Sequence, residues 1–298
     1  MKTTVLCIYR AACYSPGMVE RDEAILHAVA SRLAHAGYAV SLIHEEEFTA
    51  AVPMPDVVLH MTRSSRALDI LERWQAAGCR VINSVEGIRS VERASLAELC
   101  AQQGIPTPTT WIVSTTEAPL TALTTEGELT SITFPCWVKR TGSCAQEPDD
   151  VRRADDADEY QQCLSHLRSR GIPKAVVMAH IEGQNFKFYA VEGPNFYYCL
   201  PTTSLGYNKF SGAPHDMHPD ASAEETESPS LTLAPTDVDL RFNFHLSSFH
   251  FPLGLPIFGG DFIVGPDGVA RLIDLNDWPS FSACRDEAAD AIARLVIG

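Results

Sequence analysis

The stretch from Ile257 to Ser280 constrains the fold of this chain most strongly, because it has the pattern of a β-hairpin. An apolar run with β-branched residues, Phe258 to Val264, is followed by a second apolar run, Ala270 to Leu275. Between the two runs, Pro266-Asp267-Gly268 supplies residues that favour a tight turn. The sequence therefore predicts two antiparallel strands joined by a short loop.

Three oxygen-bearing side chains lie on these strands. Asp274 and Asn276 are two residues apart and point to the same face of a regular strand, which Asp261 can reach from the neighbouring strand. Two carboxylates and an amide are hard donors that suit Mg²⁺, an ion that keeps several waters and binds substrate phosphates. The alternative is an ordinary hairpin with acidic ends, because Asp and Asn beside a turn usually serve only the turn.

The hairpin resembles the magnesium-binding end of the ATP-grasp fold, where two carboxylates and an Asn on antiparallel strands hold the metal against the phosphates of ATP. Four further stretches resemble that family in the expected order, so that the resemblance covers roughly residues 80–280. They are the entry into the ATP domain (81–83, 91–93 and 104–109), a strand with a phosphate-binding Lys (134–139), a flexible loop (142–146) and the adenine-side strand and hinge (176–183).

The resemblance implies an α/β (α+β) fold, in which an N-terminal parallel α/β subdomain precedes the ATP-grasp lid and the metal-binding subdomain. It places Lys139 and Arg93 on the nucleotide phosphates, and Lys187 on the phosphates or the substrate. The implied nucleotide-binding residues also include the loop residues Gly142 and Ser143 and the hinge residues Val177, Met178, Ala179, His180, Ile181 and Glu182. Ala179-His180 departs from the family, which commonly has an acidic or amide residue before an aromatic one. Lys139 also ends an otherwise apolar strand, so its charge must leave the core or find an anion.

Strands and helices alternate over the first 85 residues, which predicts a small parallel sheet. Ligands of such sheets lie beyond the carboxyl ends of the strands, so Arg10, Arg63 and the helix start at Ser15-Pro16-Gly17 are expected to line an acceptor pocket. The alternative for both arginines is a solvated position on a loop. We expect a substrate-side domain at 1–85 and an ATP-grasp domain at 86–298, with a mobile lid at about 109–183 and a flexible acidic insert at about 206–235. His215 and His218, in that insert, fit solvated histidines better than a metal pair.

Composition excludes several classes of partner. The formal net charge of −15 argues against nucleic acid and anionic membranes as partners. No apolar run approaches the roughly 20 residues that span a bilayer, and the first strand is too short for a signal peptide. The 9 cysteines lack metal-like spacing and fit reduced, partly buried thiols. These features predict a cytoplasmic protein.

Two enzyme reactions and one inactive role remain open. The favoured one is a carboxylate-amine or carboxylate-thiol ligase, similar to the ribosomal-protein-glutamylase-like and glutathione-synthetase-like enzymes. Such a ligase uses ATP and Mg²⁺ (or Mn²⁺) to convert a small acidic substrate into an acyl phosphate. An amine is the expected second substrate. The alternatives are an inositol phosphate kinase of the same fold and a degenerate ATP-binding module. Gly259, where D-alanine-type ligases carry an Arg, argues against those ligases, and Asp274 resembles the kinases, whereas the scarcity of clustered basic residues argues against a polyphosphate acceptor.

Overall fold

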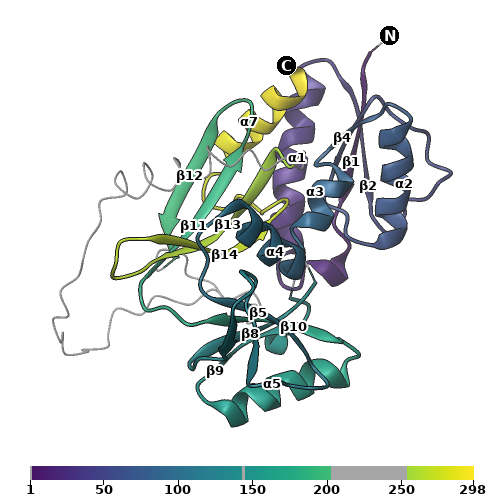
Figure 1. Ribbon diagram of the computed structural model, residues 1–298. Coiled ribbons are helices and arrows are strands. Elements are labelled where there is room, and N and C mark those ends of the chain that lie inside the picture. The colour runs from purple at the N-terminus through teal and green to yellow at the C-terminus, as the bar shows by residue number, and fades with distance from the viewer. Residues whose placement is uncertain (1, 143–144, 203–253) are drawn as a thin grey trace, which may run out of the picture.

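The computed structural model describes residues 2–142, 145–202 and 254–298, and within them three four-stranded sheets and one two-stranded sheet (Figure 1). The acidic insert expected at 206–235, with its two histidines, lies outside the described residues, as does Ser143. None of the described helices has the length and hydrophobicity needed to cross a bilayer. The predicted mixed α/β fold class is confirmed, whereas the domain boundaries stay a prediction.

The N-terminal residues form the expected parallel sheet, with the strand order β2-β1-β3-β4. Its elements are β1 (Thr4–Tyr9), η1 (Ala12–Tyr14), α1 (Val19–His35), β2 (Ala39–His44), β3 (Val57–His60), α2 (Ser65–Ala76) and β4 (Arg80–Ile82). Helix α1 packs against the last helix, α7 (Arg285–Ile297), so the beginning and the end of the described chain lie side by side (Figure 1). The sequence predicted the first of these two helices, which follows Ser15-Pro16-Gly17.

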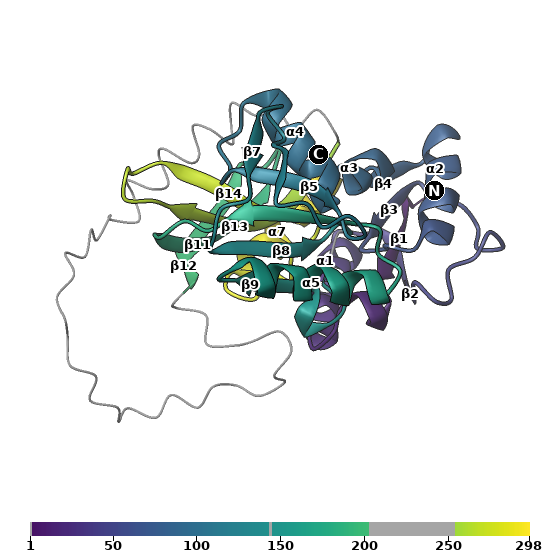
Figure 2. The same ribbon diagram turned by 60° about the horizontal axis from the view of Figure 1, so that its bottom comes forward.

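A second, antiparallel sheet has the order β5-β10-β8-β9 and carries α5 along one side (Figure 2). Its strands are β5 (Thr110–Ser114), β8 (Cys136–Arg140), β9 (Val151–Ala154) and β10 (Lys174–Ala179). The elements around it are α3 (Val85–Ser90), α4 (Arg93–Gln103), η2 (Pro148–Asp150), α5 (Ala157–Ser169) and the two-stranded pair β6 (Thr121–Leu123) and β7 (Leu129–Ser131). Tyr160, Leu164 and Leu167 of α5, which recur at helical spacing, are buried against this sheet.

The third sheet contains the predicted hairpin and is called the hairpin sheet below. Its order is β12-β11-β13-β14, from β11 (Gln184–Val191), β12 (Phe196–Pro201), β13 (Ile257–Val264) and β14 (Ala270–Asn276). The two faces of β11 enter different cores: Phe186 and Phe188 pack on one side, and Tyr189 and Val191 on the other. Because both faces are apolar, a charged side chain on this sheet needs a partner or a solvent-filled cavity.

Candidate functional site

Five charged side chains converge where the hairpin sheet meets the second sheet. Asp261 and Asp274 are register partners across β13 and β14, next to a β-bulge, and Lys187 is the register partner of Asp261 on β11. Lys187 Nζ lies 3.1 Å from Asp261 Oδ1, and Arg93 Nη2 lies 3.3 Å from Asp274 Oδ2. Lys139 approaches from β8 and interacts electrostatically with both carboxylates. We call these residues the charge cluster.

Lys139 is almost completely buried, with 5% of its surface exposed. Its Nζ donates to the Ile273 carbonyl at 3.0 Å and lies 3.6 Å from the Met178 sulfur. Burial lowers the pKa of Lys139 to about 8, although the negative charge of Asp274 acts to raise it. The ammonium group is therefore charged at neutral pH but poorly solvated, which is the condition under which it gains most from an anionic ligand.

The two carboxylates differ in their electrostatic environment. Burial raises the pKa of Asp261, and the charge of Asp274 adds to this effect, while Lys187 opposes it. Burial also acts to raise the pKa of Asp274, but the positive charges of Arg93 and Lys139 outweigh it, so that this pKa lies below its ordinary value. A cation placed between the carboxylates would stabilise the charged form of both.

The donor set of the cluster fits a hard divalent cation. Asp261 and Asp274 offer carboxylate oxygens from facing strands, and Asn276 ends β14 opposite Gly259. Among the described residues, no three His, Cys, Asp or Glu side chains converge as metal ligands, so the remaining ligands would be the Asn276 amide, water and substrate oxygens. This incomplete protein shell is typical of Mg²⁺ bound together with a phosphate ligand.

A cavity of about 420 Å³ opens beside the charge cluster, within the size range of small-molecule sites. Predicted residues that line it are Arg93, Lys139, Met178, Ala179, His180, Ile181, Glu182, Asp261 and Asp274. Predicted residues within the described chain that do not line it are Arg10, Arg63, Gly142, Val177, Lys187 and Asn276. The cavity therefore joins most of the predicted hinge to the charge cluster.

The hinge segment supplies both backbone and side-chain groups to the cavity. Val177 is the exception, because its side chain is fully buried in the core of the second sheet. Within the described part of the chain, the N–H groups of Ile181 and Glu182 have no hydrogen-bond partner. Trp137, which the sequence analysis did not single out, donates from its indole nitrogen to His180 Nδ1 at 3.2 Å. The other ring nitrogen of His180 lies 3.0 Å from Glu182 Oε1.

The loop after β8 is held by charged contacts near the cluster. The carbonyl of Gly142 accepts a hydrogen bond from Arg93 Nη1 at 3.3 Å, and Arg140 Nη1 binds the Gln146 side chain. Asp150 is fully buried and accepts from the backbone N–H of Gln146 at 2.8 Å. The predicted phosphate-binding role of Gly142 stays a prediction.

The two N-terminal arginines follow β1 and β3 as predicted, but their side chains contact the chain itself. Arg10 binds Asp22 at 3.0 Å and the Trp278 carbonyl at 2.8 Å. Arg63 forms an ion pair with Asp277, and both side chains are buried. Their predicted contact with an acceptor substrate stays a prediction, and Asp277 is a partner that no local sequence pattern indicated.

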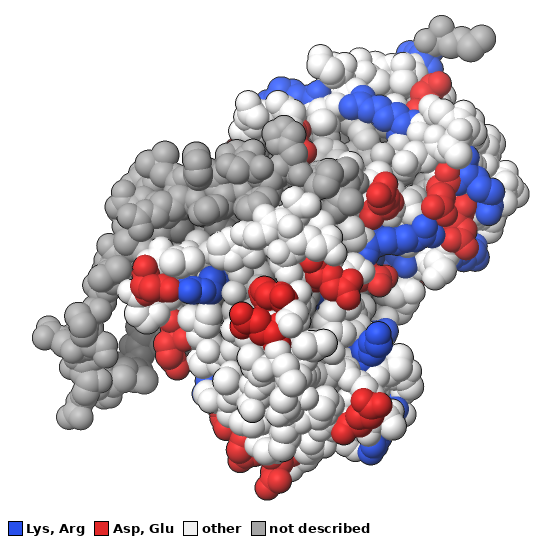
Figure 3. All heavy atoms as spheres, in the orientation of Figure 1, with Lys and Arg blue, Asp and Glu red and all other residues white. Residues whose placement is uncertain are grey.

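Position 259 has no room for a side chain. A Cβ atom there would lie 2.6 Å from the Phe188 carbonyl oxygen and 2.8 Å from Pro279. The Arg that D-alanine-type ligases carry at this point therefore does not fit the packing of this chain. On the face seen in Figure 3, acidic and basic side chains are interspersed, and Lys and Arg form no continuous basic surface among the described residues.

Among comparisons with known proteins, solved structures identify the fold. No protein-family model matches the sequence, and no curated protein is significantly similar to it. Solved structures do match over the whole chain. D-alanyl-alanine synthetase A from Vibrio cholerae has 13% identity and a TM-score of 0.66, with 99% of this chain and 98% of that chain covered.

Two further structures give the same result. A RimK domain ATP-grasp protein from Sphaerobacter thermophilus has 15% identity and a TM-score of 0.65, covering 99% of this chain and 100% of its own. D-alanine–D-alanine ligase from Bacillus anthracis, complexed with ATP, has 13% identity and a TM-score of 0.66, covering 100% and 98%. The chain therefore has the ATP-grasp fold.

Proposed function

We propose that this protein is an ATP- and Mg²⁺-dependent ligase that activates the carboxylate of a small acidic substrate as an acyl phosphate, which an amine or a thiol then attacks. The charge cluster carries the proposal, because it places Lys139 and Arg93 beside Asp261 and Asp274 in the wall of a cavity that the hinge also lines. The likeness in fold to two ligases, one of them complexed with ATP, supports the same class of chemistry.

The cluster residues have complementary roles in this proposal. Lys139 and Arg93 would bind phosphate oxygens, and Asp261, Asp274 and Asn276 would hold the divalent cation. Bound Mg²⁺ would neutralise and orient the phosphates. The cluster has three cations and two carboxylates, a net charge of +1 (3 − 2), which is less than a triphosphate requires. Phosphoryl transfer of this kind depends on positioning and charge stabilisation, so no covalent protein nucleophile is needed.

Direct phosphoryl transfer to a hydroxyl, as in inositol phosphate kinases, is the second candidate. Asp274 stands where ligases more often have Glu, and Gly259 leaves no room for the Arg of D-alanine-type ligases. A polyphosphate acceptor, however, requires a dense set of basic side chains. Arg10 and Arg63 contact acidic side chains of this chain instead, which leaves fewer basic side chains for a polyphosphate acceptor.

The two reactions differ in where the phosphate goes. We would measure ADP release with pools of carboxylic and amino acids, peptides, and sugar or inositol phosphates, and follow the phosphorus by NMR. A ligase produces free phosphate only when an acid and an amine or thiol are both present. Phosphate on an acceptor, with no amine requirement, would replace the ligase with the kinase. Asp274→Asn serves as the control, because ADP release that persists in this variant does not come from the proposed site.

A further inference from the structure

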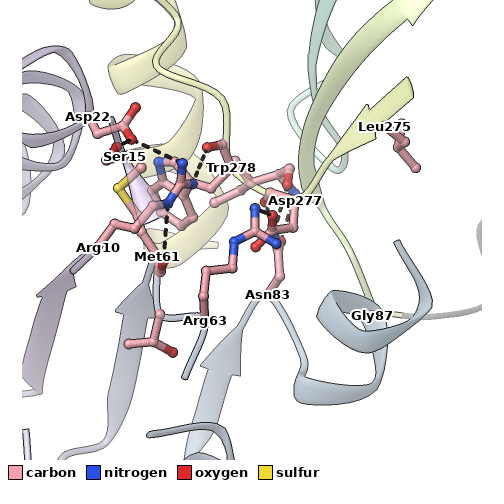
Figure 4. A network of polar contacts seen from close by, with 12 residues as sticks. Arg10, Ser15, Asp22, Met61, Arg63, Asn83, Gly87, Leu275, Asp277 and Trp278 are labelled. Carbon is pink, nitrogen blue, oxygen red and sulfur yellow. Dashed lines mark hydrogen bonds and ion pairs between the residues drawn. The ribbon is translucent and has the colours of Figure 1, made fainter. Parts of the chain in front are cut away.

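The segment that follows the predicted metal ligand Asn276 is held by the N-terminal parallel sheet. Figure 4 shows Arg10, Arg63 and Asn83, which follow β1, β3 and β4, pointing toward Asp277 and Trp278. These three side chains lie at the carboxyl-end edge of the sheet, where α/β proteins commonly bind ligands. Here that edge binds the end of the hairpin.

Asn83 joins the two open ends of the hairpin. Its Oδ1 accepts from the Ile257 N–H at 2.9 Å, and its Nδ2 donates to the Ile257 carbonyl at 2.6 Å. The same Nδ2 also donates to the Asp277 carbonyl. The amide therefore satisfies both backbone groups at the start of β13 and fixes the backbone just beyond β14, as a neighbouring strand would.

Arg10 fixes the next residue of the same segment. Its Nη2 donates to the Trp278 carbonyl at 2.8 Å, while its Nη1 binds Asp22 at 3.0 Å and its Nε donates to the Met61 carbonyl at 3.3 Å. These contacts orient the guanidinium group. Asp22 also accepts a hydrogen bond from Ser15, which connects the segment to the start of α1 (Figure 4).

Arg63 and Asp277 form a deeply buried ion pair in this network. The Arg63 side chain is 3% exposed and the Asp277 side chain is fully buried. Arg63 reaches Asp277 through one terminal nitrogen, and its Nε and Nη1 have no partner among the described residues. Asp277 is completely buried. An isolated charge at either position would be strongly unfavourable, so each side chain depends on the other.

We propose that Arg63 is a positioning residue, which holds Asp277 and through it sets Asn276 and Asp274 for binding a divalent cation. This inference rests on the proposed function. Asp277 directly follows Asn276, so their Cα atoms are about 3.8 Å apart. Since Mg²⁺ requires oxygen ligands at about 2.0–2.1 Å in near-octahedral geometry, a small displacement at Asp277 changes the fit at Asn276. The parallel sheet thereby becomes part of the metal site without contacting the metal.

The experiment separates positioning from stability. Arg63→Met alone leaves a buried, unpaired Asp277 and is expected to destabilise the fold. The double variant Arg63→Met/Asp277→Leu replaces the ion pair with apolar side chains, which often preserves stability. Arg63→Lys is the conservative variant. The guanidinium group makes one charged contact with Asp277, and a Lys ammonium group can replace that contact. Asp290→Asn is the matched control, because it breaks the exposed Arg32 ion pair between α1 and α7.

Each variant would be titrated with Mn²⁺ at saturating ADP, with the free ion followed by electron paramagnetic resonance, and its thermal unfolding measured. The double variant should unfold near the wild-type temperature and bind Mn²⁺ about 10- to 100-fold more weakly, as when support for a metal ligand is lost. Arg63→Lys and Asp290→Asn should bind Mn²⁺ like the wild type, and ADP without metal should bind equally to all variants.

Three results would contradict the inference, each in a different way. If the double variant binds Mn²⁺ as tightly as the wild type, while Asp274→Asn does not bind it, the metal site stands and the positioning role of Arg63 is wrong. If the wild-type protein with ADP binds no Mn²⁺, the proposed metal site fails and the inference fails with it. If Arg63→Lys loses Mn²⁺ affinity as fully as the double variant, the retained charge does not position Asp277.

Discussion

Replacing Lys139 with Met should weaken ATP binding and leave the ligand-free protein at least as stable as the wild type. The two effects have one cause. Lys139 is buried among Met178, Ile273 and the cluster charges, so its ammonium group is poorly solvated until a phosphate binds it. Met has a similar length and no charge, so it removes both the phosphate contact and the cost of burying the ammonium group.

The pKa of Lys139 gives the size of the stability effect. Its lowering from 10.5 to about 8 is 2.5 units (10.5 − 8), or about 3 kcal/mol of unfavourable free energy for the charged form. Because the folded pKa lies below the unfolded one, this cost is fully present at pH 7 and disappears as the pH rises from about 8 to 10.5. Losing the hydrogen bond to the Ile273 carbonyl cancels about 1 kcal/mol of the stability that the variant gains. The lost attraction to Asp274 needs no separate correction, because the pKa of Lys139 already includes it.

The expected gain for the ligand-free variant is thus up to about 2 kcal/mol at pH 7, or a few degrees in the unfolding temperature. The lost charge-assisted phosphate contact should weaken ATP binding by about 1.5–3 kcal/mol, roughly 10- to 100-fold. Calorimetric ATP titration and thermal unfolding measure the two effects. Lys174→Met is the matched control, because it removes an exposed Lys from the neighbouring strand β10. Unchanged ATP affinity, or a less stable ligand-free variant, would refute the reasoning.

Three further outcomes are expected. ATP affinity should be constant below pH 8 and decline above it as Lys139 loses its proton, with proton uptake on binding near pH 8.5, which calorimetry in buffers of different ionisation enthalpy detects. Asp274→Asn should abolish the increase in ATP affinity caused by Mg²⁺, whereas Asp267→Asn, at the exposed turn of the same hairpin, should retain it in the same titration. Asp150→Ala should cost about 2–4 kcal/mol in urea unfolding, because two backbone N–H groups and Arg170 lose a buried acceptor, and the exposed Asp149→Ala should cost little.

Elements with a clean periodicity were predictable from the sequence. Phe186 and Phe188 of β11 alternate with Lys187, a pattern typical of a strand, and Pro266-Asp267-Gly268 placed the turn of the hairpin correctly. Pairing across strands then brought Asp261 opposite Asp274, as the strand spacing allowed. These features depend on local patterns, which a single sequence contains.

Short elements were missed because pairing rather than composition defines them. Strand β9 has the sequence VRRA, and it is a strand because Arg152 pairs with Val138 and Arg153 with Trp137 on β8. Helix α3 has only six residues, and the side-chain oxygen of Ser84 at its start accepts a hydrogen bond from the Gly87 N–H. Neither is long enough to show a hydrophobic period.

The arginines illustrate a different limit. Their positions after β1 and β3 were predicted correctly, but the groups that they bind come from the far end of the chain. Arg10 and the Trp278 carbonyl are 268 positions apart, and Arg63 finds Asp277 in the same segment. Such a contact depends on how the parallel sheet and the hairpin sheet dock, which no spacing within either one reveals.

The contact between Trp137 and His180 has a consequence for spectroscopy. An indole N–H can only donate, so Nδ1 of His180 must carry a lone pair, and the proton of the neutral ring is on Nε2, directed at Glu182. Trp137 lines the cavity, so a fluorophore is built into its wall, and the emission of this indole should respond to a nucleotide base bound there.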